Sequence, residues 1–120
     1  MQYKVPYLGG RDLCGRSAVV SVPGSKSITN RALLLAVLAK GKSHLSGILL
    51  SDDSRHLISC LKELGFSLSL NEEARTVDIC GEGGTLPKKQ ASLYVGSAGT
   101  AARFLTALTA LSGGEYRIDA

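Results

Sequence analysis

The stretch that decides the fold is Pro23-Gly24-Ser25-Lys26-Ser27-Ile28-Thr29-Asn30-Arg31, which continues into the apolar run Ala32-Leu33-Leu34-Leu35-Ala36-Val37-Leu38-Ala39. Small turn-forming residues lead here into an apolar helix that begins with a lysine, two serines and an arginine. The first N–H groups of a helix lack intrahelical partners, and the helix dipole adds about half a positive charge at that end. We therefore expect this helix start to bind phosphate or carboxylate groups.

The side chains at this helix start suit an anionic ligand. Lys26 is a compact cation, Arg31 offers a planar fork for bidentate contact, and Ser27 can donate a hydroxyl. Ser27 and Arg31 are four residues apart and share one helix face. We expect the Lys26 ammonium and the Arg31 guanidinium to converge on a single anionic ligand. The alternative is that Ser25 or Ser27 only caps the helix while Lys26 is solvated.

The same Gly-Ser turn before a helix recurs 72 residues later, where Gly96-Ser97 repeats Gly24-Ser25. With that shift, three further pairs coincide: Arg31 with Arg103, Leu33 with Leu105, and Gly41 with Gly113. We infer a structural repeat, since self-similarity at a fixed shift is typical of repeated units. The alternative is two ordinary helices with serine caps.

The second helix start, Gly96-Ser97-Ala98-Gly99-Thr100, is built of small residues that would not block a ligand. Gly99 would let a ligand contact backbone N–H groups. Arg103 could reach the anion, or it could pair with an aspartate of the preceding helix.

Composition limits the classes of function. At 120 residues the chain is one domain or less, and 44% hydrophobic residues with mixed charges fit a globular protein. The net charge is +4, but the basic residues are scattered, and four Tyr, two Phe and no Trp supply little stacking surface for nucleic acid. A small acidic metabolite suits this charge better.

Targeting and membrane signals are not evident. No apolar run approaches the roughly 20 residues that span a bilayer, and the N-terminus has no secretory apolar region. We expect a cytoplasmic protein with no membrane partner and no nucleic-acid partner.

The cysteines do not indicate a metal centre. Cys14, Cys60 and Cys80 are odd in number and widely spaced, which fits neither a disulfide framework nor a zinc site. His56 and Cys60 share a helix face, but no second pair accompanies them. The glycine–lysine spacing at the first helix start also differs from a P-loop, which argues against nucleotide hydrolysis. We expect no metal.

The hydrophobic pattern predicts alternating strands and helices. Strands are expected at 17–22, 43–49, 66–70, 76–80, 92–95 and 116–119, and helices at 27–40 (ended by Gly41), between Ser51 and Gly65, and at 99–112. The order is β-α-β-α-β-β, after which β-α-β begins again. We therefore expect a fragment of a longer protein; the alternative is a small complete domain.

Two helices have features that predict their packing. Leu57, Leu61 and Leu64 form an apolar stripe on the second helix, whose first turn also carries Asp52 and Asp53. The first helix is apolar on all sides in its middle, and we expect it to pack on more than one face.

Three motifs, in this order, resemble the N-terminal part of the 5-enolpyruvylshikimate-3-phosphate synthase family. They are Pro23-Gly24-Ser25-Lys26-Ser27 with Asn30-Arg31-Ala32-Leu33, then Ser51-Asp52-Asp53, then Gly99-Thr100-Ala101-Ala102-Arg103. The resemblance runs from about Arg16 to Leu111 and covers about the first quarter of the family's length.

The resemblance implies an α/β fold with mixed sheets, in which βαβαββ repeats form an inside-out barrel. In the family, six repeats make two such domains that close over the substrates. Residues 1–22 would then belong to the other domain. Residues 23–120 would hold the first βαβαββ unit, to about residue 81, and the start of the second.

The resemblance also implies a reaction. Phosphoenolpyruvate would transfer its carboxyvinyl group to the 5-hydroxyl of shikimate 3-phosphate, through a tetrahedral intermediate and with release of phosphate. No cofactor is implied. The remaining acid and base groups of the family lie beyond Ala120, so we expect this chain alone to be inactive and to need the second domain as its partner.

The matched motifs imply roles for individual residues. Lys26 would be catalytic and touch both substrates, while Ser27 and Arg31 would hold shikimate 3-phosphate. Phosphoenolpyruvate would contact Lys26 and three residues of the second helix start: Ser97, Gly99 and Thr100. Asp52 and Arg103 would support the site.

The chain departs from the family at two positions and leaves two alternatives open. Ser97 stands where Asn is frequent, which shortens a donor, and Phe104 stands where Pro is frequent, which alters helix packing and the response to inhibitors such as glyphosate. The alternatives are a UDP-N-acetylglucosamine enolpyruvyl transferase, which has Lys-Asn in place of Lys26-Ser27, and a non-catalytic binding module for phosphorylated metabolites.

Overall fold

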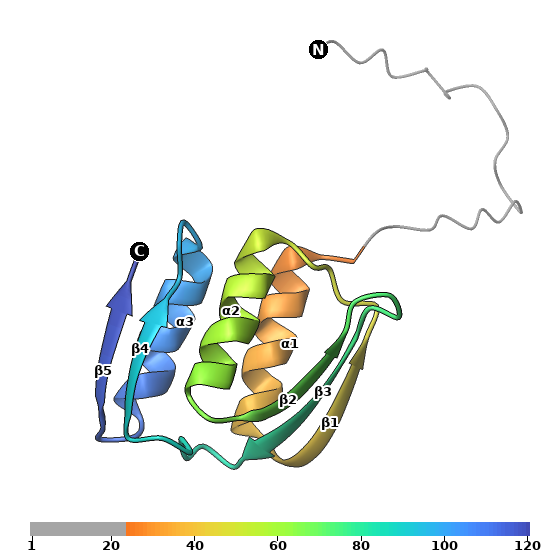
Figure 1. Cartoon of the computed structure of the whole chain (residues 1–120). Helices are drawn as coiled ribbons and strands as arrows, with labels where there is room; N and C mark the ends of the chain where they lie inside the picture. Colours follow the sequence, from red (N-terminus) through yellow and green to blue (C-terminus); the bar gives the residue numbers. More distant parts are fainter. Residues whose placement is uncertain (1–23) are drawn as a thin grey trace, which may run out of the picture.

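The computed structural model describes residues 24–120, which form three helices and five strands (Figure 1). In chain order these are α1 (Lys26–Leu38), β1 (Lys40–Ser46), α2 (Asp52–Glu63), β2 (Ser67–Asn71), β3 (Thr76–Glu82), β4 (Gln90–Tyr94), α3 (Gly99–Ala110) and β5 (Glu115–Asp119). The strand expected at 17–22 lies outside the described residues. The predicted order of elements is confirmed from the first helix onward.

The strands form two open sheets. β1, β3 and β2 make an antiparallel sheet in that order, with Lys40 opposite Glu82 in β3 and Ser67 of β2 opposite Cys80. β4 and β5 form a parallel pair, with Gln90 opposite Glu115. The expected α/β class with mixed sheets is confirmed, and the sheets of residues 24–120 do not close into a barrel.

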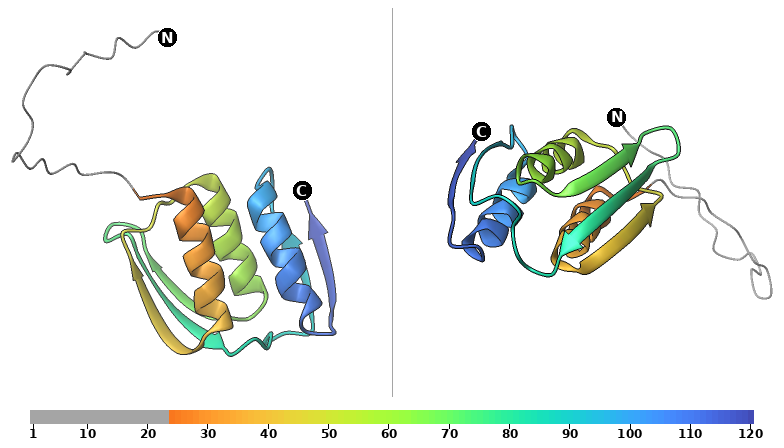
Figure 2. Two further views of the ribbon diagram at one scale, coloured as in Figure 1. Left: turned by 180° about the vertical axis from the view of Figure 1, so that it is seen from behind. Right: turned by 60° about the horizontal axis from the view of Figure 1, so that its bottom comes forward.

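The helices pack as one layer against these sheets (Figures 1 and 2). α1 and α2 cover one face of the antiparallel sheet, and α2 also contacts β4. α3 lies beside α2 and contacts β5. The helix α2 therefore joins the two halves of the structure through one continuous core.

The predicted core stripe of α2 is confirmed, because Leu57, Leu61 and Leu64 are all fully buried. α1 packs against the antiparallel sheet and against α2, as expected for a helix with more than one buried side. Its apolar surface is not fully covered, since Ile28 and Leu35 are 70% and 66% exposed. The face that carries them has no cover among residues 24–120.

The junction between α1 and β1 differs from the prediction. α1 ends at Leu38, Ala39 is already extended, and Gly41 lies within β1 with a positive φ of 100° instead of ending the helix. Pairing with β3 explains the difference, since the ladder draws Lys40 and Gly41 into the sheet. Local helix signals are weaker than such tertiary pairing.

The predicted repeat is visible in the helices. α1 and α3 each follow a Gly-Ser turn and each lead into a strand, β1 and β5 respectively. Gly41 and Gly113, which coincide after the shift of 72 residues, both have positive φ. The two copies therefore share the order of turn, helix and strand but differ in their caps, since Ser25 caps α1 whereas Ala98 precedes α3 without a side-chain cap.

An ion pair ties α2 to the turn between β2 and β3. Arg55 donates two hydrogen bonds to the carboxylate of Glu72, at 2.7 and 3.0 Å. The hydrogen bonds and the charge of Arg55 hold the pKa of Glu72 below its ordinary value. The lowered pKa means that this pair adds stability above the ordinary pKa of a glutamate, and that this stability is lost as the pH falls through the lowered pKa.

We expect Arg55→Met to raise the pKa of Glu72 toward its ordinary value, because both causes of the shift are removed. Carboxyl chemical shifts followed by NMR across an acid titration measure this. Lys62→Met, in the last turn of α2, is the control and should leave Glu72 unchanged. A Glu72 carboxyl that titrates identically with and without Arg55 would contradict the assignment.

Candidate binding site at the helix N-termini

All three helices begin at the same end of the structure and run in the same direction (Figures 1 and 2). Their first turns therefore present unpaired N–H groups and positive dipole ends to one region. Such a region attracts phosphate and carboxylate groups. The candidate site is this gathered set of helix starts.

Backbone packing fixes the start of α1. The hydroxyl of Ser25 accepts a hydrogen bond from Ile28 N at 3.3 Å and so caps the helix. A Cβ added to Gly24 would lie 2.6 Å from the carbonyl oxygen of Gly47, so only glycine allows this approach. The turn before α1 is thereby pressed against the loop that leads into α2.

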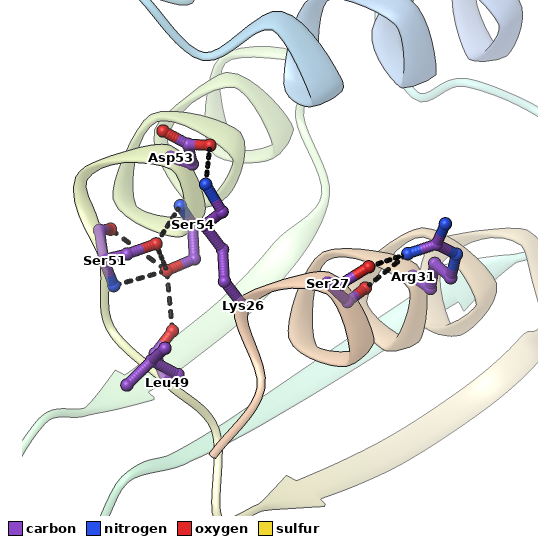
Figure 3. Close-up of polar contacts among 7 residues, drawn as sticks. All are labelled: Lys26, Ser27, Arg31, Leu49, Ser51, Asp53 and Ser54. Atoms are coloured by element: carbon purple, nitrogen blue, oxygen red, sulfur yellow. Dashed lines mark hydrogen bonds and ion pairs between the residues drawn. The ribbon is translucent and has the colours of Figure 1, made fainter. Parts of the chain in front are cut away.

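Two buried hydroxyls hold that loop at Leu49. The hydroxyl of Thr29 on α1 accepts a hydrogen bond from Leu49 N at 3.0 Å. The hydroxyl of Ser54 on α2 donates to the Leu49 carbonyl at 2.7 Å and forms a capping box with Ser51 (Figure 3). The starts of α1 and α2 are thus fixed to the backbone of the same residue.

Lys26 bridges the two helix starts. Its ammonium lies 3.0 Å from Oδ2 of Asp53 in the first turn of α2 (Figure 3). Half of the Lys26 side chain remains exposed, whereas Asp53 is mostly buried. The ammonium is therefore held in place while still open to a ligand.

Ser27 and Arg31 lie on a different side of α1 from Lys26 (Figure 3). The Arg31 guanidinium donates to the hydroxyl of Ser27 and to its carbonyl oxygen. The expected convergence of Lys26 and Arg31 on one guest is therefore not what the structure shows. At roughly 3.6 residues per turn, side chains five positions apart diverge by about 140° around a helix. α1 carries two cationic faces instead of one.

The start of α3 has no side-chain cap, unlike the starts of α1 and α2. Its N-cap is Ala98, which makes no side-chain cap, and its first turn has no acidic residue. The structure places Ser97 and Gly99 on the surface with Thr100 half-buried, and a Cβ added to Gly99 would meet open space. The surface at Gly99 is open to a small ligand, and the Gly99 N–H itself donates to the Ser97 carbonyl at 3.0 Å.

Asp52 and Arg103, the two residues expected to support the site, are both exposed and form no hydrogen bond or ion pair with Lys26 or Arg31. Asp52 is exposed, and its neighbour Asp53 makes the contact with Lys26 instead. Arg103 is exposed on α3, and no carboxylate of residues 24–120 lies within ion-pair distance of it. The expected alternative of an Arg103–Asp pair with α2 is not observed.

His56 and Cys60 have structural contacts. The Cys60 thiol donates to the carbonyl oxygen of Tyr94 at 3.3 Å, and its burial raises its pKa. The His56 ring packs edge-on against Tyr94, and a Cβ on Gly96 would lie 2.7 Å from its Nε2. α2 therefore supports the turn that precedes α3.

Residues 24–120 contain neither a metal-binding cluster nor a membrane-spanning helix. No group of three or more His, Cys, Asp or Glu side chains is arranged to hold a metal ion there. None of α1, α2 and α3 is both long enough and apolar enough to cross a bilayer.

Sequence reasoning missed three residues of this region. Thr29 and Ser54 look like ordinary helix residues in the sequence, yet they hold the loop at Leu49. Asp53 was noticed only as a first-turn acid, equivalent to Asp52. One signal was available for Asp53: the motif Ser51-Asp52-Asp53 places it two residues after a helix cap, close to the dipole end that it faces.

The helices and sheets define an α/β protein whose gathered helix starts form a candidate anion site. The chain belongs to the EPSP synthase (3-phosphoshikimate 1-carboxyvinyltransferase) family, whose family model matches residues 15–119. The resemblance noted in the sequence is thereby confirmed.

Individual relatives agree with this assignment. The 3-phosphoshikimate 1-carboxyvinyltransferase of Trichormus variabilis is 55% identical over 102 residues, which are 85% of this chain and 24% of the relative. That of Bordetella petrii is 52% identical over 83% of this chain and 22% of the relative. The EPSP synthase structure from Acinetobacter baumannii matches 74% of this chain and 20% of its own, with a TM-score of 0.67 and 29% identity. The chain thus spans about a quarter of the length of the curated relatives that it matches.

We expect Thr29→Val to lower the free energy of unfolding by about 1–3 kcal/mol, because the half-buried N–H of Leu49 loses its acceptor, the buried Thr29 hydroxyl. Urea denaturation of the 120-residue chain measures this. Thr106→Val is the matched control: its hydroxyl bonds the helix carbonyl of Ala102 on an exposed face, and the change should stay within about 0.5 kcal/mol. Equal effects of the two substitutions would contradict the role of Thr29.

Proposed function

We propose that this chain carries the N-terminal part of the substrate site of a 3-phosphoshikimate 1-carboxyvinyltransferase. In the proposed reaction the C2–O bond of phosphoenolpyruvate breaks and a new C–O bond forms to the 5-oxygen of shikimate 3-phosphate. The 5-hydroxyl loses its proton, and inorganic phosphate leaves. The reaction passes through addition and elimination, and it changes no oxidation state overall.

The observation that carries the proposal is the pair of cationic faces at the start of α1. Lys26 faces α2, and the Ser27–Arg31 pair occupies another side of the same helix turn. Two faces suit two substrates that each carry phosphate and carboxylate groups. A guanidinium binds such groups bidentately, whereas an ammonium acts as a point charge that two ligands can share.

The two cationic faces of α1 are assigned different roles in substrate binding. We assign Ser27 and Arg31 to shikimate 3-phosphate, and Lys26 to the region where both substrates meet. The release of Ser27 from Arg31 would free one hydroxyl and several guanidinium donors for the ligand. Asp53 keeps the Lys26 ammonium near the junction of α1 and α2.

The start of α3 is assigned to phosphoenolpyruvate. Its first amides lack a side-chain cap, and Gly99 lets an anionic group approach the backbone. Ser97 and Thr100 flank Gly99 and could add hydroxyl donors. Ser97 is shorter than an asparagine, so its contact would need a closer ligand or a bridging water.

These residues bind the substrates and neutralise their charge. The acid and base groups that transfer protons must come from other parts of the enzyme. We therefore propose that turnover requires the remainder of an EPSP synthase, with residues 1–22 in its second domain. The chain covers 24% of the Trichormus variabilis relative, which leaves most of that enzyme to supply the missing groups.

A chimaera tests this proposal. We expect the Trichormus variabilis enzyme to keep phosphate release from phosphoenolpyruvate and shikimate 3-phosphate when its matched segment is replaced by the corresponding part of this chain. Lys26→Met in the chimaera should lower kcat/KM by about tenfold to a hundredfold, because a charge-assisted contact is lost. A coupled phosphate assay measures both.

Lys42→Met is the control, because Lys42 is exposed on β1 away from the helix starts. It should leave kcat/KM nearly unchanged. A folded chimaera without turnover, or a Lys26→Met variant as active as its parent, would contradict the proposal.

A further inference from the structure

Asn30 is a buried polar side chain that makes no side-chain hydrogen bond within residues 24–120. It lies in α1 with none of its surface exposed, and neither its amide nitrogen nor its amide oxygen has a hydrogen-bond partner among the described residues. Buried polar groups are almost always hydrogen-bonded, so an exception of this kind calls for an explanation.

The other buried polar side chains of residues 24–120 all have hydrogen-bond partners. Thr29 bonds Leu49 N, Ser54 bonds the Leu49 carbonyl, and Thr109 bonds a carbonyl within its own helix. Asn30 is also a poor helix former in a helix interior. Neither helix propensity nor a folded-state contact accounts for it.

The position of Asn30 connects it to Lys26. The two residues are four apart in α1 and lie on one side of the helix. The Cα–Cβ bonds of a helix tilt toward its N-terminus, so the Asn30 side chain leaves the helix toward the turn that carries Lys26. The Lys26 ammonium has three donors, and the contact with Asp53 occupies one of them.

We infer that Asn30 is a positioning residue for Lys26. When a ligand bearing phosphate or carboxylate occupies the helix starts, the Asn30 amide oxygen accepts a hydrogen bond from the Lys26 ammonium. Asp53 and Asn30 then hold two of the three donors and direct the third at the ligand. This inference rests on the proposed function, since it concerns the same site.

An unpaired Asn30 amide also affects stability. Because this amide has no hydrogen-bond partner within residues 24–120, replacing it with an apolar residue of similar size removes an unfavourable buried group. Asn30→Leu should therefore leave the urea midpoint unchanged or raise it, while it weakens ligand binding. A purely structural asparagine would show a lowered midpoint.

Titration of the 120-residue chain with phosphoenolpyruvate, followed at the Gly99 amide by NMR, tests the inference. We expect Asn30→Leu to weaken binding about fivefold, the usual effect of one lost hydrogen bond. Val37→Ala is the control: it empties a buried position two turns further along α1, so it should lower the urea midpoint but leave the affinity unchanged.

A double-mutant cycle shows whether Asn30 acts through Lys26. In a Lys26→Met background, Asn30→Leu should cause no further loss of affinity. The inference is overturned if the loss persists in that background, if Asn30→Leu binds like the unmodified chain, or if it lowers the urea midpoint. If the unmodified chain itself shows no shift at Gly99, the proposed function fails and the inference falls with it.

Discussion

The backbone of Leu49 makes the contacts on which the rest of this site depends. Thr29 of α1 binds its N–H and Ser54 of α2 binds its carbonyl, so two helix starts share one half-buried anchor residue. The close approach of Gly24 to Gly47 presses the chain against the same loop. The Lys26–Asp53 pair crosses this junction, and its geometry follows from the junction's rigidity. A surface ion pair alone would add little order, since exposed pairs contribute roughly 0–1 kcal/mol.

Local signals predicted much of the fold. Ser51 and Gly65 bracket α2 as expected, and Gly65 adopts the positive φ that a helix end favours. The strands expected at 66–70 and 76–80 are also present as β2 and β3, and the turn between them is held by a hydrogen bond from Ala74 N to the Asn71 side chain. These features depend on neighbours within a few residues, which a sequence displays directly.

Features set by distant contacts were predicted less well. Gly41 resembles a helix stop, yet pairing with β3 places it in a strand. Asp52 and Asp53 look equivalent at the start of α2, and only the docking of α1 selects Asp53. The divergence of Lys26 and Arg31 could have been read from their spacing, because helix geometry alone separates them. The unpaired amide of Asn30 could not, since hydrogen-bond partners are a property of the packed state.

The central claim is that the gathered helix starts form the anion site of this chain. Titration of the ¹⁵N-labelled chain with inorganic phosphate, read as a map of backbone amide shifts, tests it most directly. We expect the largest shifts in the first turns of α1 and α3, at 26–28 and 99–101. Largest shifts on the outer face of the antiparallel sheet, around Lys42 and His44, with silent helix starts, would contradict it.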